Sequence, residues 1–150
     1  MRIAISGSQG VGKTTLIDKI WVDKSAENFH IEKEIVRSLM REGVSINKGA
    51  DHRSQLIILE AHYKNILKYP ELITDRCAID AFAYAIWDYL KGNYSFSEHK
   101  EHESIFLSCI SSYDKVFYLK PEFQLQEDGV RSTDSVYQTE IHNLFVRFFE

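Results

Sequence analysis

A glycine-rich loop between an apolar run and an amphipathic segment constrains the fold more than any other feature of this sequence. The run covers residues 2–6 (RIAIS) and leads without a spacer into residues 7–14 (GSQGVGKT). Apolar residues then recur at helical spacing at Leu16, Ile17 and Ile20. A short apolar strand that turns through glycines into a helix is typical of parallel sheets, whose strands are buried by helices on both faces. The N-terminal region therefore predicts an α/β fold.

The loop also matches a chemical signature, the pattern G-x-x-x-x-G-K-[ST]. Its glycines let backbone N–H groups turn toward a phosphate, and the following helix directs the positive end of its dipole at the same anion. In this pattern Lys13 reaches the β- and γ-phosphates, and the Thr14 hydroxyl is a ligand of Mg²⁺. The sequence therefore predicts binding of ATP with Mg²⁺. The residues predicted to contact the nucleotide are Gly7, Ser8, Gln9, Gly10, Val11, Gly12, Lys13, Thr14 and Thr15.

Apolar segments alternate with amphipathic ones along the rest of the chain. Strands are expected at 29–31, 71–74 and 115–119, and helices at 34–41, 51–68, 79–90, 97–111 and from 134 onward. Ser97 is expected to cap the helix that follows it. The alternation predicts a parallel sheet with helices on both faces. Because no linker or internal repeat interrupts it, residues 1–150 are expected to form one domain.

Asp75 and Arg76 follow the strand expected at 71–74. Ligands of such sheets bind at the carboxyl ends of the strands, where Asp75 could hold a Mg²⁺-bound water or accept a proton from an attacking hydroxyl. Arg76 could hold an acceptor or the transferring phosphoryl group. The alternative is that Asp75 caps the next helix and Arg76 lies in solvent. An extended ATPase of the AAA type would have two adjacent acidic residues here, and further subdomains.

The polar stretch 124–133 contains Gly129 and Arg131 and precedes the last expected helix, which Asp134 could cap. A glycine-bearing segment with an arginine is what a mobile lid over phosphates requires, because closing the lid excludes water from the transfer. Arg131 is therefore a candidate catalytic residue. An ordinary surface loop with an exposed arginine is the alternative interpretation.

Composition narrows the class of partner and the compartment. The formal net charge is −4 and the sequence pI is about 5.9, whereas proteins that bind a nucleic-acid backbone usually carry a basic surplus. The two cysteines, Cys77 and Cys109, form no C-x-x-C pair, which excludes a disulfide framework and a zinc motif of that kind. No apolar run has the length of a membrane span. We expect a cytoplasmic protein whose partner is a small molecule.

Together these residues resemble the small P-loop kinases, in particular the ribosylnicotinamide-kinase-like (NadR-like) group. The resemblance lies in GSQGVGKTT, in EIVR at residues 34–37, in the pair Asp75-Arg76, and in DGVRSTD at residues 128–134. It implies a Mg·ATP-dependent kinase with strand order 2-3-1-4, with Lys13 and Thr14 serving ATP.

The same resemblance implies roles for further residues. Asp75 would belong to the catalytic centre, Arg131 to the lid, and Glu34 and Arg37 to the acceptor side, although those two residues could equally form a solvated helix face. Relatives continue past the lid helix into a fifth strand, whereas the sequence given ends at Glu150, so it is either a shortened family member or a truncated sequence. The sheet would then have an open edge, which a homo-oligomer could cover.

The function expected from the sequence is transfer of the γ-phosphoryl group of ATP to a nucleoside or a (deoxy)nucleoside monophosphate. A ribosylnicotinamide-type nucleoside and a nucleoside monophosphate remain equally open as acceptors, and a hydroxymethylated base in DNA fits the acidic charge less well. The alternative is a P-loop NTPase that acts as a regulatory or assembly switch without a small-molecule acceptor.

Overall fold

Four parallel strands form the centre of the protein. The computed structural model describes residues 1–23, 26–33, 35–46, 50–122 and 135–149. The strands are β1 (Arg2–Ser6), β2 (His30–Glu32), β3 (Leu72–Asp75) and β4 (Lys115–Tyr118), and they lie in the order β2-β3-β1-β4. The parallel α/β sheet and its predicted order 2-3-1-4 are therefore confirmed.

The register of the sheet brings the carboxyl ends of β1 and β3 together. Ile5 of β1 is paired with Asp75 of β3, so a residue two positions before the phosphate loop lies beside the predicted catalytic carboxylate. On the other side of β1, Ser6 pairs with Tyr118 of β4. The site residues of β1 and β3 are thus neighbours because strand pairing places them at one edge.

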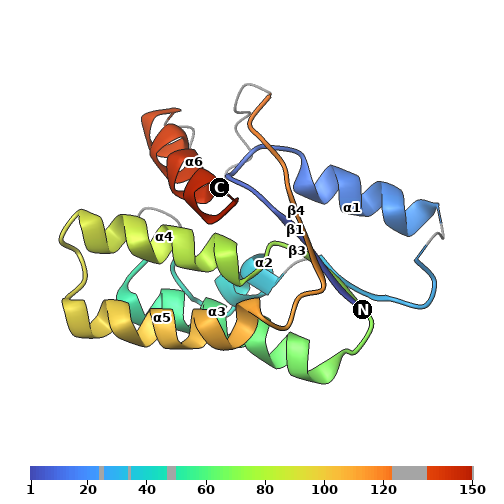
Figure 1. Cartoon of the computed structure of the whole chain (residues 1–150), viewed down its shortest axis with the longest axis horizontal. Helices are drawn as coiled ribbons and strands as arrows, with labels where there is room; N and C mark the ends of the chain where they lie inside the picture. The colour runs from blue at the N-terminus through green and yellow to red at the C-terminus, as the bar shows by residue number, and fades with distance from the viewer. Residues whose placement is uncertain (24–25, 34, 47–49, 123–134, 150) are drawn as a thin grey trace.

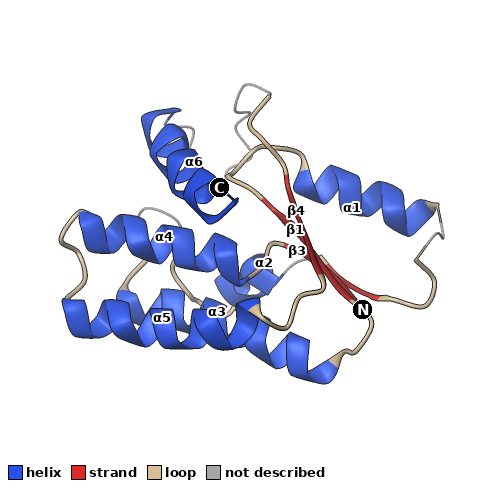
Figure 2. Cartoon of the chain, viewed as in Figure 1, coloured by secondary structure: helices blue, strands red, loops and turns tan. Residues whose placement is uncertain are grey.

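Helices cover the two faces of the sheet unequally (Figures 1 and 2). Helix α1 (Lys13–Val22) lies on one face, where Ile17 packs against Ile5 and Ile73 of the strands. The larger layer on the other face contains α3 (His52–Lys68), α4 (Ala78–Leu90), α5 (Phe96–Ile110) and α6 (Ser135–Phe149). The short helix α2 (Ile35–Arg41) contacts α3. The main apolar core lies between the sheet and α3–α6, with α4 buried along almost its whole length.

The N-cap of helix α5 (Phe96–Ile110) lies two residues before the expected one. This N-cap is Ser95, so the prediction of Ser97 was wrong. The Ser95 side chain accepts a hydrogen bond from the N–H of Glu98 at 3.3 Å, and the Ser95 N–H donates to the Glu98 carboxylate at 2.7 Å. This reciprocal capping box requires an acidic residue three positions after the cap, which Glu98 supplies only to Ser95.

Strand β4 lies at an edge of the sheet, and among the described residues it has β1 as its single strand neighbour. Its side chains are half-buried or exposed, and Phe117 keeps 50% of its surface in solvent. The described residues contain no fifth strand. The expected lid at 124–133 and the cap Asp134 lie outside the described residues. None of the described helices combines the length and apolarity that crossing a membrane would require.

Candidate functional site

The loop between β1 and α1 adopts backbone conformations that favour glycine. Gly7, Gly10 and Gly12 have φ values of 147°, 77° and 89°, in the region that side-chain-bearing residues rarely occupy. At Gly7 a Cβ atom would also lie 2.5 Å from the carbonyl oxygen of Leu119, the residue after the end of β4. The sequence therefore needs glycine here both for the turn and for the close approach of a neighbouring backbone.

Lys13 is folded back onto this loop. The residue is 5% exposed. Its Nζ donates hydrogen bonds to the carbonyl oxygens of Gly7 at 2.6 Å and Ser8 at 2.7 Å. The ammonium group thus lies at the mouth of the loop, held by backbone dipoles. A nucleotide phosphate offers this cation a stronger, charge-assisted partner at the same place.

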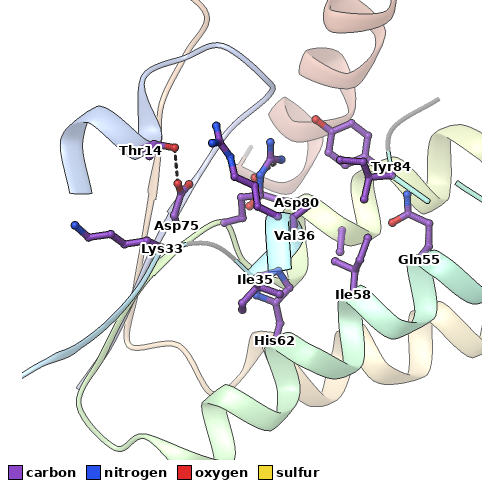
Figure 3. A pocket seen from close by; sticks show the side chains of 14 residues that line it. Thr14, Lys33, Ile35, Val36, Gln55, Ile58, His62, Asp75, Asp80 and Tyr84 are labelled. Atoms are coloured by element: carbon purple, nitrogen blue, oxygen red, sulfur yellow. Dashed lines mark hydrogen bonds and ion pairs between the residues drawn. The ribbon is translucent and has the colours of Figure 1, made fainter. Parts of the chain in front are cut away.

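Thr14 and Asp75 connect the first helix to the end of β3. The Thr14 hydroxyl donates a hydrogen bond to Oδ2 of Asp75 at 2.6 Å (Figure 3). The other carboxylate oxygen, Oδ1, is buried and has no hydrogen-bond partner within the described part of the chain. A buried carboxylate oxygen beside a hydroxyl is a donor set that suits Mg²⁺, which prefers oxygen ligands and completes its shell with water and phosphate. The residues present therefore fit the metal.

Asp75 does not cap the next helix, which was the alternative interpretation. The N-cap of α4 is Cys77, and Asp80 at the third helical position accepts a hydrogen bond from the Cys77 N–H at 3.0 Å. The Asp75 carboxylate therefore faces Thr14, whose hydroxyl donates a hydrogen bond to it, and takes no part in capping α4.

Arg76 is not in solvent either. Its side chain is 16% exposed, and Nη1 lies 4.0 Å from Oδ1 of Asp80. Burial disfavours the cation, but the interactions with Tyr84 and Asp80 outweigh this, so the pKa of Arg76 lies above its ordinary value. The backbone of Arg76 has φ 77°, a conformation held by its N–H bond to Ile5 and by the Thr74 hydroxyl, which donates to its carbonyl at 2.9 Å. Residues strained in this way cluster at functional sites.

Asp80 is a site residue that the sequence analysis missed. It is almost fully buried and accepts the N–H of Gly7 at 3.4 Å, so it joins α4 to the first glycine of the loop. Burial raises the pKa of its carboxyl group, and the positive charges of Lys13 and Arg76 partly oppose this rise. In the sequence, an acidic residue such as Asp80 in the first turn of an expected helix indicates helix capping. Its contact with the phosphate loop depends on the tertiary fold, so no local pattern could reveal it.

A cavity opens beside Thr14, Asp75 and Arg76, between the end of the sheet and helices α2, α3 and α4 (Figure 3). Its walls combine charged groups near the loop with apolar and uncharged polar groups on the helices. The lining residues are Thr14, Lys33, Ile35, Val36, Arg37, Ile46, Gln55, Ile58, His62, Asp75, Arg76, Asp80, Ala81 and Tyr84.

Two polar residues of the cavity, Gln55 and His62, lie on the buried side of α3 and were not predicted as site residues. Oε1 of Gln55 and Nε2 of His62 are buried and have no hydrogen-bond partner within the described residues. Burial, with the nearby charge of Arg76, lowers the pKa of His62 to about 3, so this imidazole is neutral at physiological pH. Unpaired buried polar atoms on a cavity wall are suited to a ligand that carries matching donors and acceptors.

The structure thus brings most of the predicted site residues together. Thr14, Asp75, Arg76 and Arg37 line one cavity, and Lys13 lies close enough to the cavity residue Asp80 to affect its pKa. Thr15, at the start of α1, is exposed. Glu34 and Arg131 lie outside the described residues, so their predicted roles remain predictions.

Comparison with known proteins places the chain among P-loop proteins. A family model described as an AAA domain matches residues 2–150. The structure of NadR protein in complex with NR superposes with a TM-score of 0.74 at 18% identity, covering 98% of this chain and 41% of that one. Deoxyadenosine kinase from M. mycoides, with the products dCMP and a flexible dCDP bound, superposes with a TM-score of 0.69 at 19% identity, covering 99% and 83%.

These likenesses show a shared fold. This chain spans about two fifths of the NadR chain and about four fifths of the deoxyadenosine kinase chain. A search of the curated proteins finds no significant match.

Proposed function

This chain belongs to the AAA domain family, and we propose that it is an ATP- and Mg²⁺-dependent phosphotransferase. The proposed acceptor of the γ-phosphoryl group is a nucleoside or a (deoxy)nucleoside monophosphate. Family membership and fold indicate nucleotide binding, and the kinase activity and the class of acceptor are the parts that we infer from the site. Unlike an extended AAA ATPase, the chain has one carboxylate followed by an arginine at the end of β3, Asp75-Arg76.

One observation carries the proposal. The hydrogen bond between Thr14 and Asp75, at 2.6 Å, lies at the wall of a cavity that Arg76 also lines. A switch that only hydrolyses its nucleotide needs access for water, whereas a kinase needs room for a second substrate next to the γ-phosphate. This cavity lies beside the Thr14–Asp75 pair, where a second substrate of a kinase would have to bind.

In this reaction the residues of the loop would bind the nucleotide and those at the end of β3 would act on the acceptor and the transferring group. Lys13 would exchange its backbone partners for the nucleotide phosphates, and Thr14 with Asp75 would hold the metal ion. When bound, Mg²⁺ supplies positive charge that neutralises the phosphate oxygens. Asp75 lies where it could orient the acceptor hydroxyl and take its proton, and the fixed positive charge of Arg76 would stabilise the negative charge of the transferring group.

The cavity walls favour a nucleoside-like acceptor. Val36 and Ile58 offer apolar surface and Tyr84 an aromatic ring for contact with a heterocycle, and the unpaired polar atoms of Gln55 and His62 could bind its edge. The NR of the NadR structure and the dCMP of the deoxyadenosine kinase structure belong to this chemical class. A homo-oligomer through the half-exposed β4 edge and a cytoplasmic location remain predictions.

A screen of acceptors tests the proposal. Wild-type protein with Mg·ATP would be assayed for ADP release against ribonucleosides, deoxynucleosides, ribosylnicotinamide and their monophosphates, each compared with the rate without acceptor. We expect at least one of these to raise ADP release well above that rate. Fast ADP release without acceptor, which no compound accelerates, would contradict the kinase and support the switch.

A further inference from the structure

Gln9 lies inside the phosphate loop at a position where the motif accepts any residue, yet the fold holds it from two sides. It is 1% exposed. Its side-chain Oε1 accepts a hydrogen bond from the hydroxyl of Tyr84 at 3.0 Å, and its backbone carbonyl accepts one from Nε2 of Gln138 at 2.8 Å. These partners lie 75 and 129 residues away in the sequence, on α4 and α6. One loop residue is therefore tied to two distant helices.

The position of Gln138 is fixed by the packing of α6 on α4. The neighbouring Tyr137 is buried in the core and contacts the ring of Trp87 edge-on. One turn further along, the carboxylate of Glu140 accepts hydrogen bonds from Nε1 of Trp87 at 2.7 Å and from Nζ of Lys91 at 2.9 Å. These contacts anchor the helix, so the Gln138 amide reaches the loop from a fixed support.

The bond from Gln138 also determines the direction of a backbone donor. The carbonyl of Gln9 and the N–H of Gly10 belong to one planar trans peptide, in which the two groups point in opposite directions. Because Gln138 draws the carbonyl toward α6, the Gly10 N–H faces away from α6. Gly10, with φ 77° and no side chain, has little resistance of its own to rotation of this peptide. The hydrogen bond from Gln138 therefore favours one orientation of this peptide.

Tyr84 provides the second restraint, from the wall of the acceptor cavity. Its ring lines that cavity, and Figure 3 shows its hydroxyl directed away from Gln55 and α3. The same hydroxyl bonds the Gln9 side chain. A single tyrosine thus contacts the cavity with its ring and the phosphate loop with its hydroxyl.

We propose that Gln138 and Tyr84 are positioning residues that hold the Gln9–Gly10 peptide with its N–H presented to the nucleotide phosphates. Nucleotide affinity then depends on the docking of α6 and on the wall of the acceptor cavity. The inference rests on the proposed function only in requiring a nucleotide at the loop, and it does not depend on the identity of the acceptor.

The test is the binding of Mg·AMP-PNP, a non-hydrolysable ATP analogue, to the full chain by titration calorimetry. Gln138→Met keeps the length of the side chain but cannot donate, and Tyr84→Phe removes only the hydroxyl. Asn143→Leu is the matched control, because it replaces an exposed amide on the same helix. Gln138→Met and Tyr84→Phe should each weaken the binding of Mg·AMP-PNP by about two- to tenfold, the effect of one net hydrogen bond. Asn143→Leu should leave the affinity unchanged. Both variants remove a hydrogen bond to Gln9, so the double variant should lose less affinity than the product of the two single effects. Because the Tyr84 hydroxyl also interacts with Arg76, Gln138→Met is the decisive variant of the two.

A second measurement separates positioning from general stability. The Gly10 amide resonance of the ¹⁵N-labelled protein should shift strongly when Mg·AMP-PNP is added to wild type, and less in Gln138→Met. Gln138→Met should remain folded at the titration temperature, with a melting temperature below that of Asn143→Leu by only the few degrees that one lost hydrogen bond costs. Unchanged affinity in Gln138→Met, a Gly10 amide that does not respond in wild type, or an unfolded fraction of the variant large enough to account for its loss of affinity would each overturn the inference. Failure of wild type to bind Mg·AMP-PNP would instead overturn the nucleotide site itself.

Discussion

Replacing His62 by glutamine should change how stability depends on pH. His62 is 1% exposed, and burial beside the charge of Arg76 lowers its pKa to about 3, whereas an unfolded histidine has a pKa of about 6.5. Between these two values the unfolded chain binds a proton that the folded chain does not bind. Stability must therefore fall as the pH decreases from 6.5 toward 3.

The magnitude follows from the two pKa values. At pH 7 the cost of keeping His62 neutral is about 0.2 kcal/mol, and at pH 5 it is about 2 kcal/mol. Any folded pKa below about 4 gives nearly the same value at pH 5, because the folded histidine is then uncharged at that pH. Glutamine is polar and cannot titrate, so His62→Gln should lack this loss.

The assay is urea unfolding of wild type and His62→Gln, followed by circular dichroism at pH 7, 6 and 5 and constant ionic strength. Subtracting each protein's value at pH 7 removes the packing cost of the substitution. The free energy of unfolding of wild type should then fall by about 2 kcal/mol more than that of the variant between pH 7 and pH 5. Parallel losses in the two proteins would refute the neutral, buried histidine on the cavity wall.

Three further substitutions test the phosphate loop and the expected lid. Lys13→Met should lower phosphoryl transfer by more than about 100-fold, with greatly weakened Mg·ATP binding in calorimetry, because the phosphates lose their counter-charge. Gly7→Ala should cost about 1–3 kcal/mol in urea unfolding, since a Cβ would lie 2.5 Å from the Leu119 carbonyl, and it should also weaken nucleotide binding. Arg131→Ala should lower kcat strongly and shift the KM for ATP only modestly, if the residue meets the phosphates in the transition state; an unchanged kcat would make 124–133 an ordinary loop.

Local sequence signals were sufficient for the central features of this fold. The apolar run before Gly7 and the spacing of the glycines predict a buried strand, a phosphate loop and a helix, and the structure contains β1, the loop and α1 there. The position of Asp75 at a strand end was also predictable, because parallel strands end at the same edge. The strand order came from the family resemblance and was confirmed.

What the sequence did not reveal depends on contacts between distant segments. Asp80 bonds to Gly7, and Gln138 bonds to Gln9, across 73 and 129 residues, and no local pattern encodes such pairs. Gln55 lies on an amphipathic helix, where a polar residue among apolar ones does not by itself indicate a cavity. These residues become recognisable only when α3, α4 and α6 are packed against the sheet.

The most direct test of the central claim follows the γ-phosphate itself. Protein would be incubated with Mg·[γ-³²P]ATP and the best acceptor from the screen, and the label in phosphorylated acceptor would be compared with that in inorganic phosphate. We expect wild type to place the label mainly on the acceptor, and Asp75→Asn to do so at least about 100-fold more slowly, with a much smaller change in ATP affinity. Label found only in inorganic phosphate with every acceptor, or an Asp75→Asn variant that transfers at the wild-type rate, would contradict the account.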